Sequence, residues 1–195
     1  MEFLRIPVDY LYVKPLFRYI NELCSCKCFP DLLISKVFPD AKELTESCAA
    51  YNALRHKAKV FRLNDRSVTM IAVADGNTPR TAALFAFRTA WKCLSIDPRL
   101  KPDKLEDWEG SIQRLRCIDS RIQDIPNLHF PKLVIAAVHS HAPLDIVAQK
   151  LTAAERVIVA IPCCVKQETD RPPDIEYTDR GIWSPHNKVK IWIDR

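Results

Sequence analysis

Residues 67–98 constrain the fold of this chain more than any other stretch, because they pass from one kind of secondary structure to another and back. Residues 68–74 are an almost continuous run of apolar and β-branched side chains, which is typical of a strand buried on both faces of a parallel sheet. Thr78 offers a capping hydroxyl and Pro79 suits the first helical position, so a helix is predicted to follow the loop. Residues 91–96 are predicted to form a second strand, and strands joined through a helix lie parallel in one sheet.

The rest of the chain repeats this alternation. Helices are predicted over residues 40–58, with Asp40 as the cap, and over residues 144–151. Further strands are predicted at residues 115–118, 133–138, 157–161, 175–183 and 188–193. The last two of these strands are predicted to form an antiparallel hairpin. The pattern therefore predicts the α/β class, as a three-layer sandwich with a mostly parallel twisted sheet that ends in an antiparallel hairpin.

Composition narrows the kind of partner. The chain has 195 residues, which is enough for one sizeable core. A formal net charge of +5 mildly favours an anionic partner but does not make the basic stripe of a dedicated nucleic-acid binder. The apolar runs are shorter than the roughly 18 residues that a membrane span needs, and charged residues near the N-terminus argue against a secretory signal. The eight cysteines read as thiols in a reducing compartment, so we expect a cytoplasmic or nuclear protein without a membrane partner.

Four residues follow the first predicted strand: Asp75, Gly76, Asn77 and Thr78. Ligands of open α/β sheets bind outside the carboxyl ends of the strands. A glycine there lets the backbone approach a ligand closely, and the helix behind it offers N–H groups to a carboxylate or phosphate. The alternative is a plain connection with Thr78 as the helix cap.

Acidic residues follow the second and third predicted strands. Asp97 could accept hydrogen bonds from both hydroxyls of a ribose, or it could only begin a turn. Asp119, followed by Ser120, could accept a hydrogen bond from an adenine amino group, or it could be a solvated loop acid.

Two histidines follow the fourth predicted strand. In an extended segment, residues two apart point the same way, so His139 and His141 could meet one site. One could act as a general base, the pair could bind a metal with Asp145 or His186, or both could only bond the loop backbone.

Cysteines cluster at two places. Cys24, Cys26 and Cys28 form a C-x-C-x-C run that could hold a soft metal, although no second pair follows at zinc-finger spacing. Cys163 and Cys164 come directly after the fifth predicted strand. Buried or half-exposed thiols without a metal are the plainer interpretation of both clusters.

Several of these segments resemble one family. The stretches VADGNTPRTA, LSIDP, CIDSRIQDIP and FPKLVIAAVHSHAPL resemble, in this order, four segments of the class I S-adenosylmethionine-dependent methyltransferases. These are the glycine-rich first motif, the ribose-binding acid, the segment around the adenine, and the fourth strand with its loop. The resemblance covers roughly residues 60–195 and implies a Rossmann-like cofactor-binding domain there, with residues 1–59 as an N-terminal arm and helix packed on the core of a single compact domain.

The resemblance also implies a function. Asp75 to Thr78 would hold the amino-acid end of S-adenosylmethionine, Asp97 its ribose, and Asp119 with Ser120 its adenine. His139 and His141 would face the methyl acceptor, with RNA or a phosphorylated small molecule favoured, and no metal is required. Two alternatives remain: a non-catalytic binding or assembly module, which the single glycine of the first motif favours, and a metal-dependent hydrolase built on the two histidines.

Overall fold

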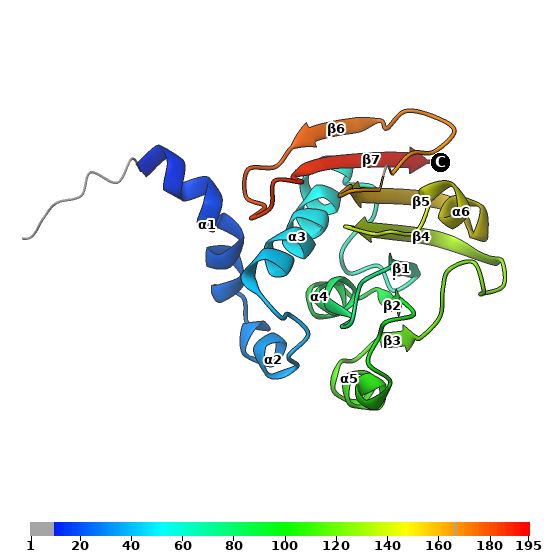
Figure 1. Ribbon diagram of the computed structural model, residues 1–195, viewed down its shortest axis with the longest axis horizontal. Helices are drawn as coiled ribbons and strands as arrows, with labels where there is room; N and C mark the ends of the chain where they lie inside the picture. The colour runs from blue at the N-terminus through cyan, green and yellow to red at the C-terminus, as the bar shows by residue number, and fades with distance from the viewer. Residues whose placement is uncertain (1–9, 166) are drawn as a thin grey trace, which may run out of the picture.

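The computed structural model describes residues 10–165 and 167–195, and its centre is one seven-stranded sheet (Figure 1). The strands are β1 (Val68–Val73), β2 (Lys92–Ile96), β3 (Leu115–Ile118), β4 (Leu128–Val138), β5 (Leu151–Ile161), β6 (Ile175–Thr178) and β7 (Lys188–Asp194). Their order is β3-β2-β1-β4-β5-β7-β6, and β7 alone runs antiparallel, to β5 on one side and β6 on the other. The predicted α/β class and the closing hairpin are confirmed.

The strand bounds differ from the prediction mainly at β4 and β5. Both strands begin five or six residues earlier than the apolar runs indicate, and their first residues pair with each other, as Leu128 with Leu151. Burial alternates over residues 128–132, so this part of β4 has one half-exposed face. A search for continuous apolar runs misses such a segment. Strand β6 ends at Thr178, earlier than the predicted end at residue 183, so the loop that leads to β7 is longer than predicted.

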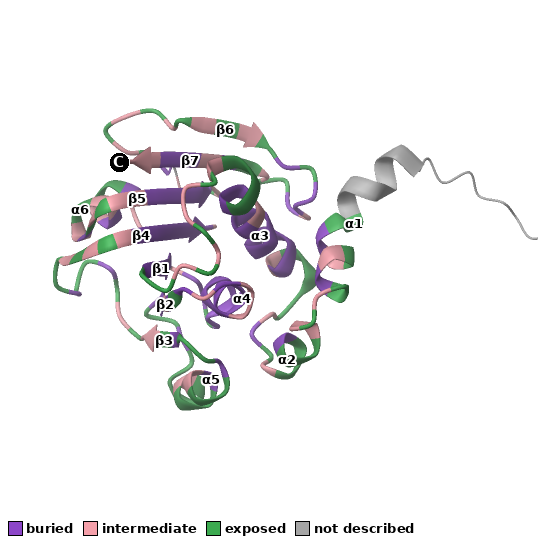
Figure 2. Cartoon of the chain, turned by 180° about the vertical axis from the view of Figure 1, so that it is seen from behind, coloured by how far each residue is buried: buried purple, intermediate pink, exposed green. Residues whose placement is uncertain are grey.

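Helices lie on both faces of the sheet (Figure 1). They are α1 (Tyr10–Cys24), α2 (Phe29–Ile34), α3 (Ala41–Asn52), α4 (Arg80–Arg88), α5 (Leu105–Ser111) and α6 (Leu144–Lys150), and a π-helical turn, Ala53–Ala58, continues α3. Alternate strand residues build two cores, with Met70 and Ala72 facing α3 and α4 and Ile71 and Val73 facing the side of α6. Burial is densest along the central strands and α3 (Figure 2). The sheet and its two covers form the predicted three layers.

The N-terminal helices share the larger core. Asp40 caps α3 as predicted, since the Glu43 N–H donates to its carboxylate over 2.7 Å. Tyr51 of α3 packs edge-on against Phe85 of α4, with ring centroids 5.4 Å apart. Helices α1, α2 and α3 each contribute buried residues to this core, and the division of the chain at residue 60 stays a prediction.

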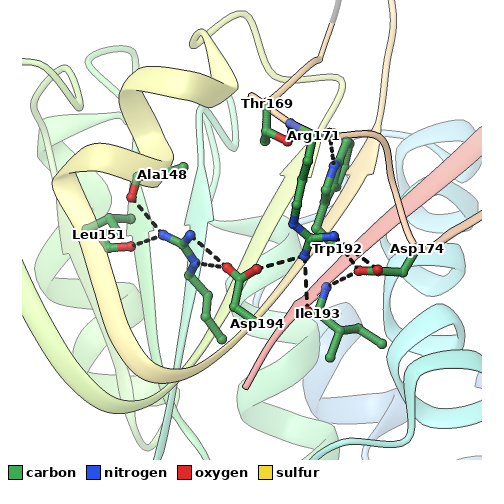
Figure 3. A network of polar contacts seen from close by, with 9 residues as sticks. Ala148, Leu151, Thr169, Arg171, Asp174, Trp192, Ile193 and Asp194 are labelled. Carbon is green, nitrogen blue, oxygen red and sulfur yellow. Dashed lines mark hydrogen bonds and ion pairs between the residues drawn. The ribbon is translucent and has the colours of Figure 1, made fainter.

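A proline-containing loop connects β5 to β6, and none of the described residues between these strands is helical. Ion pairs fix this loop to the end of β7 (Figure 3). Arg171 donates to Asp194 over 2.7 Å and to Asp174 over 3.0 Å, while Arg156 of β5 also bonds Asp194 over 2.8 Å. The indole N–H of Trp192 donates to the Arg171 carbonyl over 3.0 Å, which gives the loop a further contact with β7.

Within the described residues, we found no helix with the length and apolar character that crossing a bilayer requires.

Candidate functional site

A pocket of about 430 Å³ lies at the carboxyl ends of β1, β2 and β4. It is the place where the alternation of strands and helices predicts a ligand. Its walls are the last residues of β1 and β2 and the loops that follow β2, β3 and β4: Val73, Ala74, Ile96, Asp97, Pro98, Arg99, Arg121, Ile122, Gln123, His141 and Ala142.

Asp97 and Gly76, which carry the sequence hypothesis, are in direct contact at this edge. The Gly76 N–H donates to one carboxylate oxygen of Asp97 over 2.7 Å, and the Arg99 N–H donates to the other over 2.7 Å. The Asp97 side chain is only 1% exposed. Gly76 has a φ of +91°, in the region that favours glycine, so this position of the loop suits a residue without a Cβ.

The start of α4 differs from the prediction. Thr78 does not cap the helix, because Pro79 occupies the capping position and the Thr78 hydroxyl donates to the Val37 carbonyl. The cap is Asp75, a buried side chain whose carboxylate accepts the N–H groups of Thr81 over 3.1 Å and Ala82 over 3.2 Å. Burial raises the pKa of Asp75. These two N–H groups are therefore already bonded, contrary to the expectation that they would be free for a ligand.

Arg80 fills the space beside Gly76. Its guanidinium donates to the Asp75 carbonyl, and a Cβ added to Gly76 would lie 2.5 Å from Arg80 Nη1. The Arg80 Nε lies 3.6 Å from a carboxylate oxygen of Glu43. Asn77, in contrast, is exposed. Of the four residues predicted after β1, only Asn77 presents its side chain to solvent.

The segment after β3 reaches the pocket two residues later than predicted. Asp119 is exposed, Ser120 is half-buried, and neither lines the pocket. Arg121 and Gln123 line it, together with the buried Ile122. The stretch CIDSRIQDIP indicated this segment. The adenine contact was assigned there to Asp119 and Ser120, and not to the residues that follow them.

His139 and His141 do not share one set of neighbours. The expectation rested on an extended backbone, but His139 has a φ of +50° and ends the strand geometry. The His139 Nε2 lies 3.3 Å from a carboxylate oxygen of the fully buried Glu46, and its ring centroid is 6.1 Å from that of His186. Burial, aided by the positive charge of Lys42, lowers the pKa of His139 to about 4, so the imidazole is neutral at neutral pH.

Glu46, which the sequence analysis missed, has a fully buried carboxyl. Desolvation raises the pKa of the Glu46 carboxyl, and the Lys42 ammonium nitrogen lies 3.0 Å from one of its oxygens. Neither oxygen accepts a well-aligned hydrogen bond from any described residue. Glu46 lies mid-helix in α3, a position that gives no local signal of function.

His141 is exposed and turns toward the loop after β5. Its Nε2 lies 3.4 Å from the Cys164 Sγ, and the Cys163 and Cys164 sulfur atoms are 3.8 Å apart. Neither Asp145 nor His186 belongs to this group. The metal site suggested for the two histidines together is therefore not supported.

Comparison with known proteins gives a likeness in structure only. No protein-family model matches the sequence, and no curated protein matches it. The crystal structure of a mutant of MtNAS in complex with S-adenosylmethionine aligns with 93% of this chain and 72% of its own, at 14% identity and a TM-score of 0.51. A second crystal structure of the same MtNAS mutant gives 14% identity, 93% and 74% coverage, and a TM-score of 0.50.

Another solved structure similar to this chain is that of the Burkholderia thailandensis 1,6-didemethyltoxoflavin-N1-methyltransferase, at 13% identity, 98% and 76% coverage, and a TM-score of 0.43. Because all these identities are low, the likeness concerns the fold. The chain therefore has a Rossmann-like fold, which is the fold that the resemblance of its sequence segments implies.

Proposed function

We propose that this protein binds S-adenosylmethionine at the carboxyl edge of its sheet and transfers the methyl group to an acceptor. The observation that carries the proposal is the pocket that joins the ends of β1, β2 and β4 around the buried Asp97. Its volume of about 430 Å³ lies within the range usual for small-molecule sites. MtNAS, which shares the fold, was crystallised with S-adenosylmethionine, and this supports the choice of ligand.

Asp97 suits the two hydroxyls of the cofactor ribose. Each of its oxygens accepts one backbone N–H, from Gly76 or Arg99, and a carboxylate oxygen has a second lone pair for a further donor. The Arg99 guanidinium is 63% exposed, and its Nε lies 3.5 Å from Asp97. We expect this side chain to swing away when a ribose approaches the carboxylate.

The residues after β3 suit an adenine. The buried Ile122 gives the base an apolar surface, and the exposed Arg121 can stack its guanidinium on the base. Gln123 offers both a donor and an acceptor to the polar edge of the base. In this proposal residues 121–123 take the role that the sequence assigned to Asp119 and Ser120.

The amino-acid end of the cofactor would lie along the loop after β1. Asp75 and Thr78 hold this loop from inside through their own hydrogen bonds, so their part is to position it. Gly76 lets the loop turn, and the exposed Asn77 is the side chain left to contact the ligand.

The acceptor would approach from the side of His141, which stands at the edge of the pocket. Placing the acceptor in line with the methyl carbon supplies much of the rate of such a transfer. The exposed imidazole of His141 is the proposed acceptor-side base, and the neutral, half-buried His139 is proposed to shape the same loop. A net charge of +5 supports RNA or a phosphorylated small molecule as the acceptor.

One observation favours a non-catalytic binding module as the second candidate. Asp75 and Arg80 already occupy the start of α4 and the space beside Gly76, so these groups are not free for a ligand.

Calorimetric titration with S-adenosylhomocysteine separates the two candidates. The methyltransferase proposal predicts saturable binding with one site per chain. Arg121→Ala should weaken the affinity for S-adenosylhomocysteine by roughly 2- to 30-fold, which is the contribution of a cation–π contact. Arg66→Ala is the matched control, since Arg66 is an exposed arginine that does not line the pocket. No heat at millimolar ligand would refute the methyltransferase proposal and leave the binding module.

A further inference from the structure

We propose that His141, Cys163 and Cys164 form a zinc-binding site with one open coordination position. Thiolate and imidazole ligands together are the donor set that proteins use for zinc. Each residue offers one ligand atom, and all three atoms lie within 4.8 Å of one another. Within residues 10–165 and 167–195 this is the one group of three or more such side chains that is close enough to hold an ion.

The distances fit tetrahedral coordination. With Zn–S near 2.3 Å and Zn–N near 2.05 Å, tetrahedral angles place two sulfur atoms about 3.8 Å apart and a sulfur and a nitrogen about 3.6 Å apart. The Cys163 and Cys164 sulfur atoms are 3.8 Å apart, and the Cys164 sulfur lies 3.4 Å from the His141 Nε2. The Cys163 sulfur lies at most 4.8 Å from the imidazole nitrogen, so a shift of roughly 1.2 Å at most would bring it to the 3.6 Å that tetrahedral coordination requires.

The fold brings the ligands together. Val138 and Ile161 pair at the ends of the parallel strands β4 and β5, so the loops that follow them leave the sheet side by side. Gln167 ties the two loops together: its buried amide donates to the Ser140 carbonyl over 2.8 Å and to the Ala142 carbonyl over 3.3 Å. The backbone on both sides of His141 is thus held from the segment that carries the two cysteines. A site held this way loses little freedom on binding a metal.

The fourth coordination position faces solvent. His141 and Cys164 are exposed and Cys163 is half-buried. Structural zinc sites have four protein ligands, whereas sites with three protein ligands keep a position for water or substrate. His141 lines the pocket around Asp97, and the two cysteines line a neighbouring pocket of about 390 Å³ with His186 and Lys188. A zinc ion here would stand between the two pockets, and His141 would then hold the ion through its Nε2, so it could act as a base only in the zinc-free protein.

The test is a zinc titration of the full chain without a histidine tag. The protein is reduced with a phosphine, stripped of metal, and titrated with zinc chloride against a chromophoric chelator, with no S-adenosylmethionine present. We expect one strongly bound zinc per chain. Cys163→Ser and Cys164→Ser should each weaken binding by roughly 100-fold or more, beyond the 10- to 100-fold that loss of a supporting residue costs. Cys24→Ser, at an exposed thiol of the C-x-C-x-C run, should leave the affinity unchanged.

A second readout needs no variant. Zinc should protect Cys163 and Cys164 of the wild-type protein from alkylation, as mapped by peptide mass spectrometry, and Co²⁺ should give a thiolate charge-transfer band. The proposal is overturned if the wild-type chain binds no zinc, or if Cys24→Ser weakens zinc binding and Cys163→Ser and Cys164→Ser do not. It is also overturned if Cys163 and Cys164 are joined as a disulfide under the same reducing conditions. Because the titration contains no cofactor, failure to bind S-adenosylmethionine would leave its result unchanged.

Discussion

Replacing Asp97 by asparagine tests whether this carboxylate binds a ligand or only supports the fold. The carboxylate accepts two backbone N–H groups, each over 2.7 Å, and is 1% exposed. A hydrogen bond to a charged group contributes about 1.5–3 kcal/mol. Alanine removes both bonds and would cost roughly 3–6 kcal/mol, a large part of the stability of an ordinary domain. Asparagine keeps one oxygen acceptor, so we expect a loss of about 1.5–3 kcal/mol and a folded protein.

The same substitution removes the charge and one acceptor that the ribose would use. Affinity for S-adenosylhomocysteine should therefore fall by a further 1.5–3 kcal/mol, or roughly 10- to 150-fold. Urea unfolding measures the stability, and calorimetric titration below the transition measures the affinity. Asp103→Asn is the matched control, since Asp103 is exposed and outside the pocket. Reduced stability with unchanged affinity would mean that Asp97 has only a structural part, and the ribose assignment would be wrong.

Three further outcomes are expected. Gly76→Ala should lower the free energy of unfolding in urea by roughly 1–3 kcal/mol, because the φ of +91° is unfavourable for alanine and the new Cβ would meet Arg80. A variant as stable as the wild type would contradict this. The pKa of His139 falls from its ordinary value near 6.5 to about 4 in the fold, so its contribution to stability is present above pH 6.5 and is lost as the pH falls toward 4. Between pH 6.5 and 5 the wild type should thus lose about 1.6 kcal/mol more than His139→Gln, and parallel curves would argue against a buried neutral imidazole. Arg171→Ala should lower the free energy of unfolding by only about 1 kcal/mol, because the Arg171 ion pairs are partly exposed. It should also speed proteolysis between β5 and β6, and an unchanged cleavage rate would show that these ion pairs do not fix the loop.

The central part of the fold could be predicted because its signals are local. Strand β1 reads as a continuous apolar run, β3 occupies the four residues expected, and Asp40 caps α3 as its position before a helical pattern suggests. The early residues of β4 and β5 could not be predicted in this way. These two segments alternate in burial, and they form strands because they pair with each other, which is a tertiary effect.

Some candidate site residues lie where the sequence places them, and others do not. Asp97 and Gly76 lie where the order of strands places them. The cap of α4 was misassigned because Asp75 reaches the helix from six residues before Thr81, beyond the reach of the usual capping pattern. His139 was misplaced because a single left-handed residue ends the alternation of an extended strand.

The contact of His141 with Cys164 spans 23 positions along the chain and crosses between two strands. A signal was present, since both residues come directly after runs that read as buried parallel strands. Loops that follow neighbouring strands of this kind leave the sheet at the same edge. The missing information was that β4 and β5 are neighbours, which only the sheet order supplies.

The proposed function requires a nucleoside cofactor to lie against the Asp97 carboxylate. Amide NMR of the ¹⁵N-labelled protein during titration with S-adenosylhomocysteine tests this directly. Signals of Gly76 and Arg99, whose N–H groups bond Asp97, should shift together with that of Gln123, at one common affinity. No shift at millimolar ligand, or shifts confined to residues outside this pocket, would contradict it.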